Sequence, residues 1–420
     1  MREMKDSGVK WIGVIPDDWQ VNNPKYHFTQ RKDRAPQGMV QLTASQKHGV
    51  ITQTEYMERT GANIVTVQKD FDILKLVCAG DFVIHMRSFQ GGLEYSEKTG
   101  SISSAYVMLI PGETICEPRY YKWFFKSSNY IDALSSTSNL VRDGQAMRWA
   151  NFIQLPITFP PAAEQKRIAD FLDAKCAEID ALAADIQTQI DTLEQYKRSV
   201  ITETVTKGLN PDAEMKDSGI QWIGDMPAHW DVIRGKYILR YMQKPVREDD
   251  GVITCFRDGE VTLRSNRRED GFTMSDKEIG YQGIDVGDLV VHGMDGFAGS
   301  IGISDSRGKA SPVLNVLDTD QCKRYIMYYL RSMAYSDVFL ALATGIRVRS
   351  CDLRWNKLAE LSYPVPPLDE QNAIVKHIDS VLSKADAVIA DKKAQLATLD
   401  EYKKSLIFEY VTGKKEVPVS

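Results

Sequence analysis

The sequence predicts an α+β protein that is built twice, in which two globular blocks are joined by a long antiparallel helical coiled coil. Three observations predict this fold. A motif at residues 4–21 returns at 215–232 with eleven of eighteen positions identical. Two stretches, 160–208 and 366–414, carry a helical pattern of apolar residues and share short motifs at an offset of 206. Between these segments, short β-branched runs alternate with turns rich in Gly, Asp and Ser, which is typical of sheets.

The spacing of these repeats divides the chain into four segments. The N-terminal motif and the first globular block occupy 1–159, and the first long helix occupies 160–214. The repeated motif and the second block occupy 215–365, and the second long helix with a tail occupies 366–420. Because both halves follow one plan, we expect an internal pseudo-twofold repeat.

The first helical stretch begins after Pro160-Pro161 and ends at Gly208, which are start and stop signals for a helix. Its apolar residues recur every seven positions and form one narrow seam on a helix of about 45 residues, on the order of 65 Å long. So long a seam needs a second helix, and the short link to Glu214 predicts that the two helices run antiparallel. The predicted seam residues are Leu172, Ile179, Ile186, Leu193, Val200, Ile378, Leu382, Ile389, Leu396, Leu399 and Leu406.

The two globular blocks share a skeleton although few of their residues are identical. Residues 80–85 (GDFVIH) match 287–292 (GDLVVH), and each reads as a turn followed by an apolar strand. Amphipathic patterns predict helical segments at 118–134 and 321–343. Further strands are expected at 40–42, 64–67, 106–110, 252–255 and 300–303. Each block is therefore predicted to be a curved sheet with helices on one side.

Composition and charge place the chain among ordinary soluble proteins. Of its 420 residues 43% are hydrophobic and 26% charged, and the formal net charge is -5. The long helical segment 160–214 is acidic, with 6 Lys and Arg against 11 Asp and Glu, so the globular blocks are the less acidic parts. The first residues, MREMKDSGVKWIG, lack the apolar core that a signal peptide needs, and no apolar run is long enough for a membrane span. Six cysteines without a CxxC pair indicate reduced thiols, and we expect a cytoplasmic protein.

No motif in the sequence is typical of a catalytic, metal or cofactor site. Residues 23–26 (NPKY) differ from the adenine-methyltransferase motif by a lysine in place of a proline. The glycines within 293–302 lack the Gly-Lys-Ser/Thr ending of a phosphate-binding loop. Asp70, Asp72 and Lys75 are spaced as in a nuclease core, but such triplets arise by chance in a highly charged chain. The six histidines have no metal-ligand spacing, so the sequence predicts a non-catalytic chain without a metal site.

Three motifs occur twice and in the same order. They are MKDSGVKWIG at 4–13 and MKDSGIQWIG at 215–224, PPAAEQKRIADFLD at 160–173 and PPLDEQNAIVKHID at 366–379, and LEQYKRSVI at 193–201 and LDEYKKSLI at 399–407. Pro-Pro followed by Glu-Gln is also a good helix cap, so one motif alone is weak evidence. Their ordered recurrence covers essentially the whole chain. In this plan the chain resembles the DNA specificity subunits of type I restriction–modification systems.

The resemblance implies a function for each part. Each globular block would be a target recognition domain that reads one half of a bipartite, asymmetric sequence in double-stranded DNA. The long helices would set the spacing between the half-sites and bind two methyltransferase subunits, and two restriction–translocase subunits would complete the complex. S-adenosylmethionine, ATP and Mg²⁺ would be needed only by those partners. The chain itself would be non-catalytic, without a cofactor and without a membrane partner.

DNA contacts are expected from loops, because a sheet buried against helices does not reach a groove. Arginine is favoured because it reads guanine edges and phosphates. In the first block the candidates are Thr43, Ser45, Gln46, Lys47, Arg87, Ser88, Gln90 and Arg142. In the second block they are Arg257, Arg264, Met294, Asp295, Arg347 and Arg349. For each of these residues, an exposed polar loop position without a DNA contact is an equally good reading.

Two other classes of function stay open from the residues alone. One is a coiled-coil adaptor whose globular ends bind proteins, which sequence-selective retention of duplex DNA would exclude. The other is a self-contained DNA methyltransferase or nuclease, which the missing donor loop and metal carboxylates disfavour.

Overall fold

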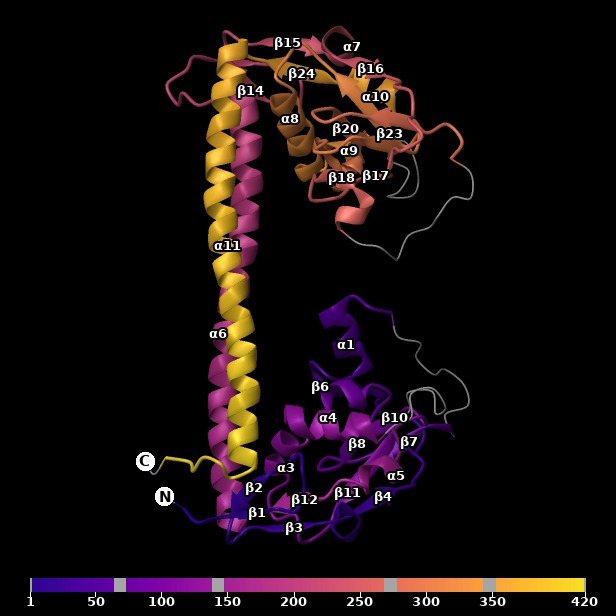
Figure 1. Ribbon diagram of the computed structural model, residues 1–420, viewed down its shortest axis with the longest axis vertical. Helices are drawn as coiled ribbons and strands as arrows, with labels where there is room; N and C mark the ends of the chain where they lie inside the picture. The colour runs from indigo at the N-terminus through magenta and orange to yellow at the C-terminus, as the bar shows by residue number, and fades with distance from the viewer. Residues whose placement is uncertain (1, 64–72, 138–146, 268–277, 343–352, 419–420) are drawn as a thin grey trace. The chain divides into compact units, whose positions relative to one another are not determined.

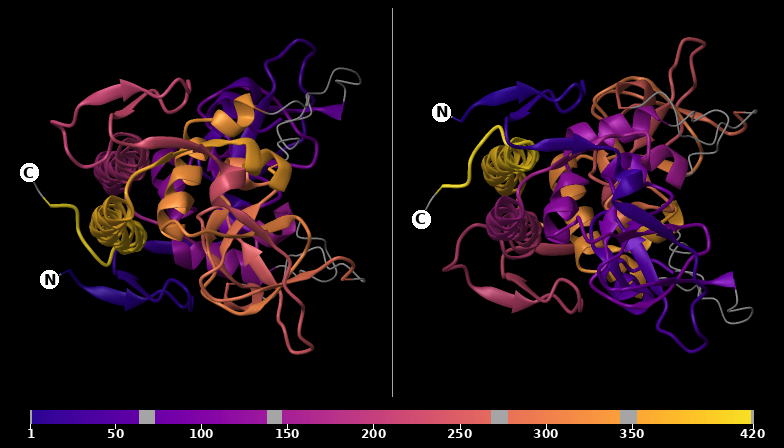
Figure 2. Two further views of the ribbon diagram at one scale, coloured as in Figure 1. Left: turned by 90° about the horizontal axis from the view of Figure 1, so that it is seen from above. Right: turned by 90° about the horizontal axis from the view of Figure 1, so that it is seen from below.

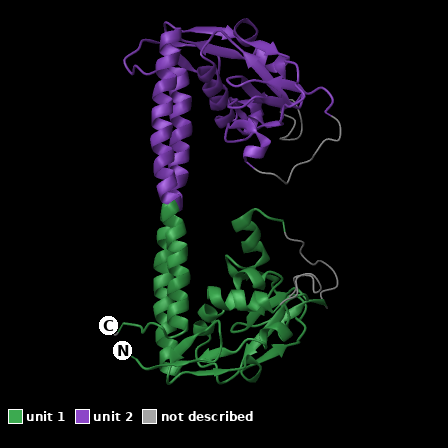
Figure 3. Cartoon of the chain, viewed as in Figure 1, with its two compact units in different colours: residues 1–186, 394–420 green, residues 187–393 purple. Residues whose placement is uncertain are grey.

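The computed structural model describes residues 2–63, 73–137, 147–267, 278–342 and 353–418. By its internal contacts the chain divides into two compact units (Figure 3). Unit 1 contains residues 1–186 and 394–420, and unit 2 contains residues 187–393. Each unit therefore combines one globular domain with half of each of the two long helices. The C-terminal part of the second long helix, from residue 394, belongs to unit 1. The C-terminal part of the first long helix, from residue 187, belongs to unit 2.

The two long helices are α6 (Ala162–Lys207) and α11 (Leu368–Val411), of 46 and 44 residues. They lie side by side in both end-on views of Figure 2. In unit 1 the rings of Phe171 and Tyr410 lie 4.5 Å apart between centroids. In unit 2 Lys197 Nζ lies 2.6 Å from Asp386 Oδ1. Early residues of one helix thus face late residues of the other, and the predicted antiparallel coiled coil is confirmed.

The seam of this helix pair is apolar and covered. Leu172 and Ile378 are fully buried, and the other predicted seam residues are buried or half-buried. Val200 is only half-buried, and the adjacent Ile201 packs into the core instead. Charged residues flank the seam, as in the 2.6 Å contact between Lys403 Nζ and Asp180 Oδ1. The seam thus holds the helices together through apolar contacts.

The domain of unit 1 is built on a four-stranded antiparallel sheet in the order β4-β11-β8-β9 (Figure 1). Its strands are β4 (Phe28–Arg31), β11 (Val107–Pro111), β8 (Phe82–Ile84) and β9 (Glu94–Tyr95). Two-stranded pairs surround it: β1 (Met4–Asp6) with β2 (Val14–Pro16), β3 (Gln20–Asn22) with β12 (Ile157–Phe159), β5 (Leu42–Ser45) with β6 (Gly49–Thr52), and β7 (Lys75–Val77) with β10 (Gly100–Ile102). Its helices are η1 (Pro24–Tyr26), α1 (Gln53–Thr60), α2 (Ser88–Gly91), α3 (Pro118–Phe124), α4 (Ser128–Ser136) and α5 (Trp149–Phe152).

The domain of unit 2 repeats this plan with a sheet in the order β16-β23-β20-β21. Its strands are β16 (Arg240–Met242), β23 (Leu314–Asp318), β20 (Leu289–His292) and β21 (Ile301–Ile303). The surrounding pairs are β13 (Met215–Asp217) with β14 (Asp225–Pro227), β15 (Asp231–Arg234) with β24 (Ser362–Val365), β17 (Ile253–Cys255) with β18 (Val261–Leu263), and β19 (Gln282–Ile284) with β22 (Gly308–Ala310). Its helices are α7 (Gly235–Ile238), η3 (Arg264–Asn266), η4 (Gly296–Ala298), α8 (Lys323–Tyr335), α9 (Val338–Ala341) and α10 (Trp355–Glu360). The predicted α+β class and internal repeat are confirmed.

Local boundaries differ from those expected in three places. The helical pattern at 321–343 forms two helices, α8 and α9, and between them Asp337 has the left-handed backbone angle φ 55°. The helical pattern at 118–134 forms two helices, α3 and α4, because the chain turns at Ser127, whose hydroxyl donates to the carbonyl of Phe124 at 2.7 Å. The strand expected at 64–67 lies outside the described residues. The other expected strands occur with ends shifted by a few residues, as at β5 and β11.

The repeated motifs tie each domain to the start of a long helix. Gln165 lies in the first turn of α6, and its Oε1 accepts the backbone N–H of Glu117 ahead of α3 at 3.2 Å. Gln371 makes the equivalent bond in unit 2, where it accepts the N–H of Cys322 at 2.9 Å. The Glu-Gln motif therefore does more than cap a helix, since it fixes the start of α3 in unit 1 and of α8 in unit 2 on the coiled coil.

A second tie joins each domain to the end of the other repeat's helix. The hydroxyl of Tyr120 in α3 donates to the carbonyl of Val411 at 2.7 Å, and Tyr325 in α8 donates to Val205 at 3.0 Å. Both tyrosines are fully buried. Domain orientation within each unit is thus set by both helices at once, which positions the loops described next.

Candidate nucleic-acid interface

Two of the predicted recognition segments of the first domain lie together. Thr43 and Ser45 belong to β5, and Gln46 and Lys47 form the turn to β6. The amide of Gln46 donates to the backbone carbonyl of Arg87 at 2.8 Å, which joins this hairpin to the loop before α2. The exposed members of this set are Gln46, Lys47, Arg87 and Gln90. These four side chains form the exposed part of the predicted surface.

Two other candidates of the first domain face inward. Ser88 is fully buried, and its Oγ accepts the backbone N–H of His85 at 2.9 Å. Thr43 is half-buried, and its hydroxyl bonds to that of Tyr106, whose pKa burial raises. The position of Ser88 disfavours the direct DNA contact that was predicted for it, because its only polar side-chain atom is used to hold the loop.

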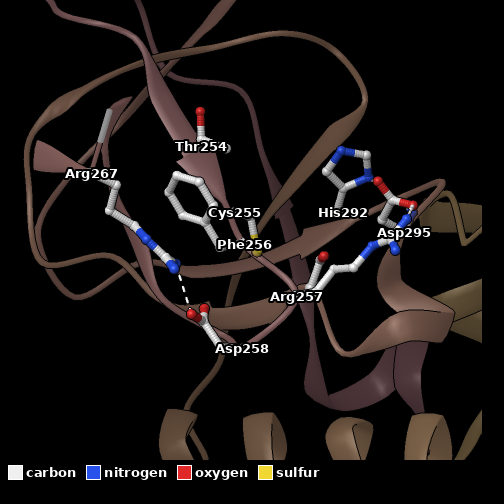
Figure 4. Close-up of a pocket in the computed structure, with 9 residues that line it drawn as sticks. Thr254, Cys255, Phe256, Arg257, Asp258, Arg267, His292 and Asp295 are labelled. Carbon is white, nitrogen blue, oxygen red and sulfur yellow. Dashed lines mark hydrogen bonds and ion pairs between the residues drawn. The ribbon is translucent and has the colours of Figure 1, made fainter. Parts of the chain in front are cut away.

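In the second domain the candidates surround a pocket of about 620 Å³ between the β17–β18 turn and the loop after β20 (Figure 4). Arg257 Nη2 lies 3.1 Å from Asp295 Oδ1. The side chain of Arg257 is 61% exposed and that of Asp295 is 34% exposed. The two predicted residues are thus brought together as an ion pair, and Met294 beside them is exposed.

His292 shapes the loop that carries these residues. Its Nδ1 accepts the backbone N–H groups of Met294 at 3.2 Å and of Asp295 at 3.0 Å. Burial lowers the pKa of His292, which keeps the ring neutral and Nδ1 able to accept. His85 occupies the equivalent position in the first domain, where its Nδ1 accepts the N–H of Arg87 at 3.3 Å. The same residue type thus supports the same loop in both domains.

On the other side of the pocket, the charged side chain of Arg267 already has ion-pair partners. Arg267 contacts Asp258 at 2.7 Å and Glu260 at 3.1 Å, and its guanidinium lies 4.1 Å from the centroid of the Phe256 ring. Cys255 is buried, and burial raises the pKa of its thiol to about 12, so the group is a neutral thiol at physiological pH.

Arg264, another predicted contact, is half-buried, and its Nε donates to Thr254 Oγ1 at 3.3 Å. The predicted contacts Arg142, Arg347 and Arg349 lie outside the described residues, as do Asp70 and Asp72. Their predicted roles stay predictions.

The sequence was compared with family models and with known proteins. No family model matches the sequence. A putative type I restriction enzyme specificity subunit, MjaX of Methanocaldococcus jannaschii, is 23% identical over 97% of this chain and 96% of its own length. The MjaVIII specificity subunit of the same organism is 22% identical over 96% of this chain and 94% of its own length.

A solved chain from work on complex assembly and conformational transition of the type I R-M system superposes with a TM-score of 0.66. It is 14% identical and covers 96% of this chain and 99% of its own length, so it shows a shared fold. The present chain is a relative of the type I specificity subunits. The resemblance in the repeated motifs is thereby confirmed, since the relatives it matches over nearly their whole length are named specificity subunits.

The residues predicted from the sequence to contact DNA did not include His85 and His292. The matching strings GDFVIH and GDLVVH marked His85 and His292 as equivalent, which was the available signal. Their function depends on hydrogen bonds to the two or three residues that follow, and no pattern of residue types reveals those bonds. The two histidines therefore belong to the candidate site as supports of its loops.

Each unit also has a hollow where its domain faces the coiled coil. In unit 1 it measures about 680 Å³ and is lined by Lys47, Lys126 and Lys403 together with acidic residues of both sides. In unit 2 it measures about 630 Å³ and includes Arg331 and Asp386. Because acids and bases alternate in both hollows, neither has the uniform positive charge of a groove that follows a phosphate backbone.

Within the described part of the chain, no group of three or more His, Cys, Asp or Glu side chains could hold a metal ion. No helix of that part combines the length and the apolar character that a membrane crossing requires.

Proposed function

We propose that this chain is the subunit that gives a type I restriction–modification complex its DNA sequence specificity. In this proposal each domain reads one half of a bipartite, asymmetric site in double-stranded DNA. The observation that supports the proposal is that the two domains share one fold but differ in the residues of their exposed loops. The two domains share the order of their sheets and the hydrogen bonds of Gln165 and Gln371. Their loops differ: Gln46 contacts Arg87 in the first domain, whereas Arg257 pairs with Asp295 in the second.

The proposed role of the long helices is to separate the two half-sites by a fixed distance. At 1.5 Å per residue, α6 and α11 are about 69 and 66 Å long. Half-sites one turn of DNA apart have centres about 34 Å from each other, so helices of this length suffice for a site of that size. A continuous seam without an internal glycine or proline favours a stiff spacer over a flexible linker.

The outer faces of the same helices are proposed to bind two methyltransferase subunits, with two restriction–translocase subunits completing the complex. Tyr196 and Tyr402 are equivalent in the repeat and are 51% and 55% exposed. Exposed tyrosines are typical of binding hot spots, and one lies in each unit. S-adenosylmethionine, ATP and Mg²⁺ are proposed to act only in the partner subunits.

The test is selection of DNA by the complex of this chain with its methyltransferase subunits. A pool of randomised duplexes is retained on the complex and sequenced. We expect two short, different motifs at one fixed spacing. Retention without sequence preference would contradict the proposal and favour a protein adaptor. Methylation or cleavage of DNA by this chain alone, with S-adenosylmethionine and Mg²⁺ supplied, would show that it is itself an enzyme.

A further inference from the structure

The ion pair between Arg257 and Asp295 has the geometry of a preset recognition group. Only one guanidinium nitrogen, Nη2, contacts the carboxylate, at 3.1 Å. Arginine has five N–H donors in a planar fork, so most of them remain for a ligand. With 61% of the Arg257 side chain exposed, these donors are accessible from solvent at the pocket mouth.

Both partners of this pair stand on restrained backbone. Asp295 is held from one side by His292 Nδ1, and its carbonyl accepts the N–H of Ala298 at 2.9 Å. The carbonyl of Arg257 lies against Gly299, where a Cβ would approach it to 2.7 Å. Gly299 has φ +96°, a conformation that an L side chain rarely adopts, so the two loops meet at a position that requires glycine. The backbone that carries the arginine is therefore restrained before any ligand arrives, which lowers the entropy cost of binding.

The local charge decides which part of DNA suits this group. A carboxylate beside the arginine cancels its charge and is repelled by the phosphate backbone. Contacts to phosphates are therefore better made by cations that have no carboxylate beside them. A base edge in the major groove is neutral, and guanine offers there two acceptors, O6 and N7, that match two donors of one guanidinium.

We infer that Arg257, oriented by Asp295, reads one guanine in the half-site that the second domain recognises. This inference rests on the function proposed above and adds a residue and a base to it. His292 is a positioning residue, since it acts only through the loop that carries Asp295.

The neighbouring Arg267 provides a matched control. It lines the same pocket, but two carboxylates and the face of Phe256 already hold its guanidinium. Removing it changes the charge of the pocket by the same amount without removing the free donors of Arg257.

The experiment compares complexes of the methyltransferase subunits with the wild-type chain, Arg257→Ala, Arg257→Lys, Asp295→Asn and Arg267→Ala. Each complex selects from the same randomised duplex pool, and its affinity for the selected site and for a scrambled duplex is measured. Arg257→Ala is expected to lose the preference for guanine at one position of one half-site. Its affinity for the selected site should fall roughly 10- to 100-fold, the usual value of a bidentate arginine–guanine contact. Affinity for the scrambled duplex should change less than about twofold.

The other variants separate a guanine contact from a charge contact. Arg257→Lys keeps the charge without the fork, so it should lose the same preference. Asp295→Asn should weaken the preference at that position and at no other, and Arg267→Ala should retain it. Equal thermal unfolding of all five complexes shows that the changes are local.

Three outcomes would overturn the inference. They are an unchanged guanine preference in Arg257→Ala, full rescue by Arg257→Lys, or equal losses on selected and scrambled duplexes. If the wild-type complex itself selects no sequence, the proposed function fails, which this design distinguishes from failure of Arg257 alone.

Discussion

The indole Nε1 of Trp19 donates a hydrogen bond of 2.9 Å to Oε2 of Glu164, and it links the N-terminal motif to the first turn of α6 across 145 residues of sequence. Trp230 and Glu370 repeat this bond at 3.1 Å in unit 2. Both indoles are fully buried. The second tryptophan of the motif at 4–21, Trp19, and the glutamate of the Pro-Pro-x-x-Glu-Gln motif thus form one structural element, and the same holds for Trp230 and Glu370 in the second repeat.

Replacing Glu164 by alanine should destabilise unit 1. The change leaves a buried indole N–H without an acceptor and removes the ion pair of Glu164 with Arg2. A buried donor left unpaired costs about 1–3 kcal/mol. Urea unfolding followed by tryptophan fluorescence measures the loss. Glu164→Gln keeps an acceptor and should cost less than Glu164→Ala, and a larger loss for the glutamine variant would contradict this account.

Replacing Tyr120 by phenylalanine should loosen the end of α11. The variant keeps the ring in the core but removes the hydroxyl that bonds to the carbonyl of Val411. The expected loss of unfolding free energy is about 1 kcal/mol. Amide hydrogen exchange should become faster in residues 406–412 and stay unchanged in the matching end of α6. Tyr325→Phe should give the opposite pattern, and a uniform effect of either variant on both ends would argue against two separate ties.

Acid should weaken one cluster of unit 2 in a defined range of pH. Hydrogen bonds from Lys244 and Arg307 lower the pKa of Asp285 to about 2. A carboxylate whose pKa is lower in the folded state stabilises the fold above its unfolded pKa, and that stability is lost as pH falls toward the folded value. Because Asp285 is 43% exposed, solvent screening limits the contribution to about 1 kcal/mol or less.

The comparison is Asp285→Asn against the wild type in urea at pH 7, 4 and 2. The variant should be less stable at pH 7, and the difference should shrink between about pH 4 and pH 2. High salt at pH 7 should shrink it as well. A difference that is constant over this range would show that the ionised carboxylate is not its source.

Shortening the coiled coil should change the spacing of the DNA half-sites. Deleting 183–189 from α6 and the facing 393–399 from α11 removes one heptad and keeps the seam in phase. The helices shorten by about 10 Å, equivalent to about three base pairs at 3.4 Å each. Selection from a randomised pool should return both original half-sites at the shorter spacing. An unchanged spacing would exclude the proposed role of the helices as a spacer.

Replacing Tyr402 by alanine should weaken the binding of a methyltransferase subunit. A tyrosine at a binding hot spot contributes at least about 2 kcal/mol, which is roughly 30-fold in affinity. Titration of the partner, followed by analytical ultracentrifugation, should show one weakened site in Tyr402→Ala and two in the double variant with Tyr196→Ala. Leu368→Ala, at an exposed apolar residue on the other side of α11, is the control for loss of apolar surface. Two tight sites in the double variant would remove these tyrosines from the interface.

The sequence was sufficient for the architecture because that architecture depends on periodic patterns. The heptad seam from Leu172 to Val200 predicts a long helix that packs against a second helix. The duplicated motif predicts the internal repeat. The break between α3 and α4 was not predictable in the same way. The pattern stays apolar through Phe124 and Phe125, and only the bond from Ser127 to the Phe124 carbonyl shows where the chain turns.

The candidate site was predicted less completely, because it depends on contacts between distant loops. Arg257 and Asp295 are 38 residues apart, and their sequence positions do not reveal that they form an ion pair. Ser88 was grouped with exposed neighbours, yet its hydroxyl is used inside the loop. Residue type predicted which loops carry polar groups, but the direction of each side chain follows from the fold.

The exchange of helix ends between the repeats has a consequence for the order of folding. Leu406, Ile407, Tyr410 and Val411 belong to the core of unit 1, so that core lacks four apolar residues until the end of α11 has left the ribosome. Unit 2 is one continuous stretch, 187–393, and all of its residues are available earlier. Since domains fold as units during synthesis, we expect the second domain to mature before the first, the reverse of the usual order from the N-terminus.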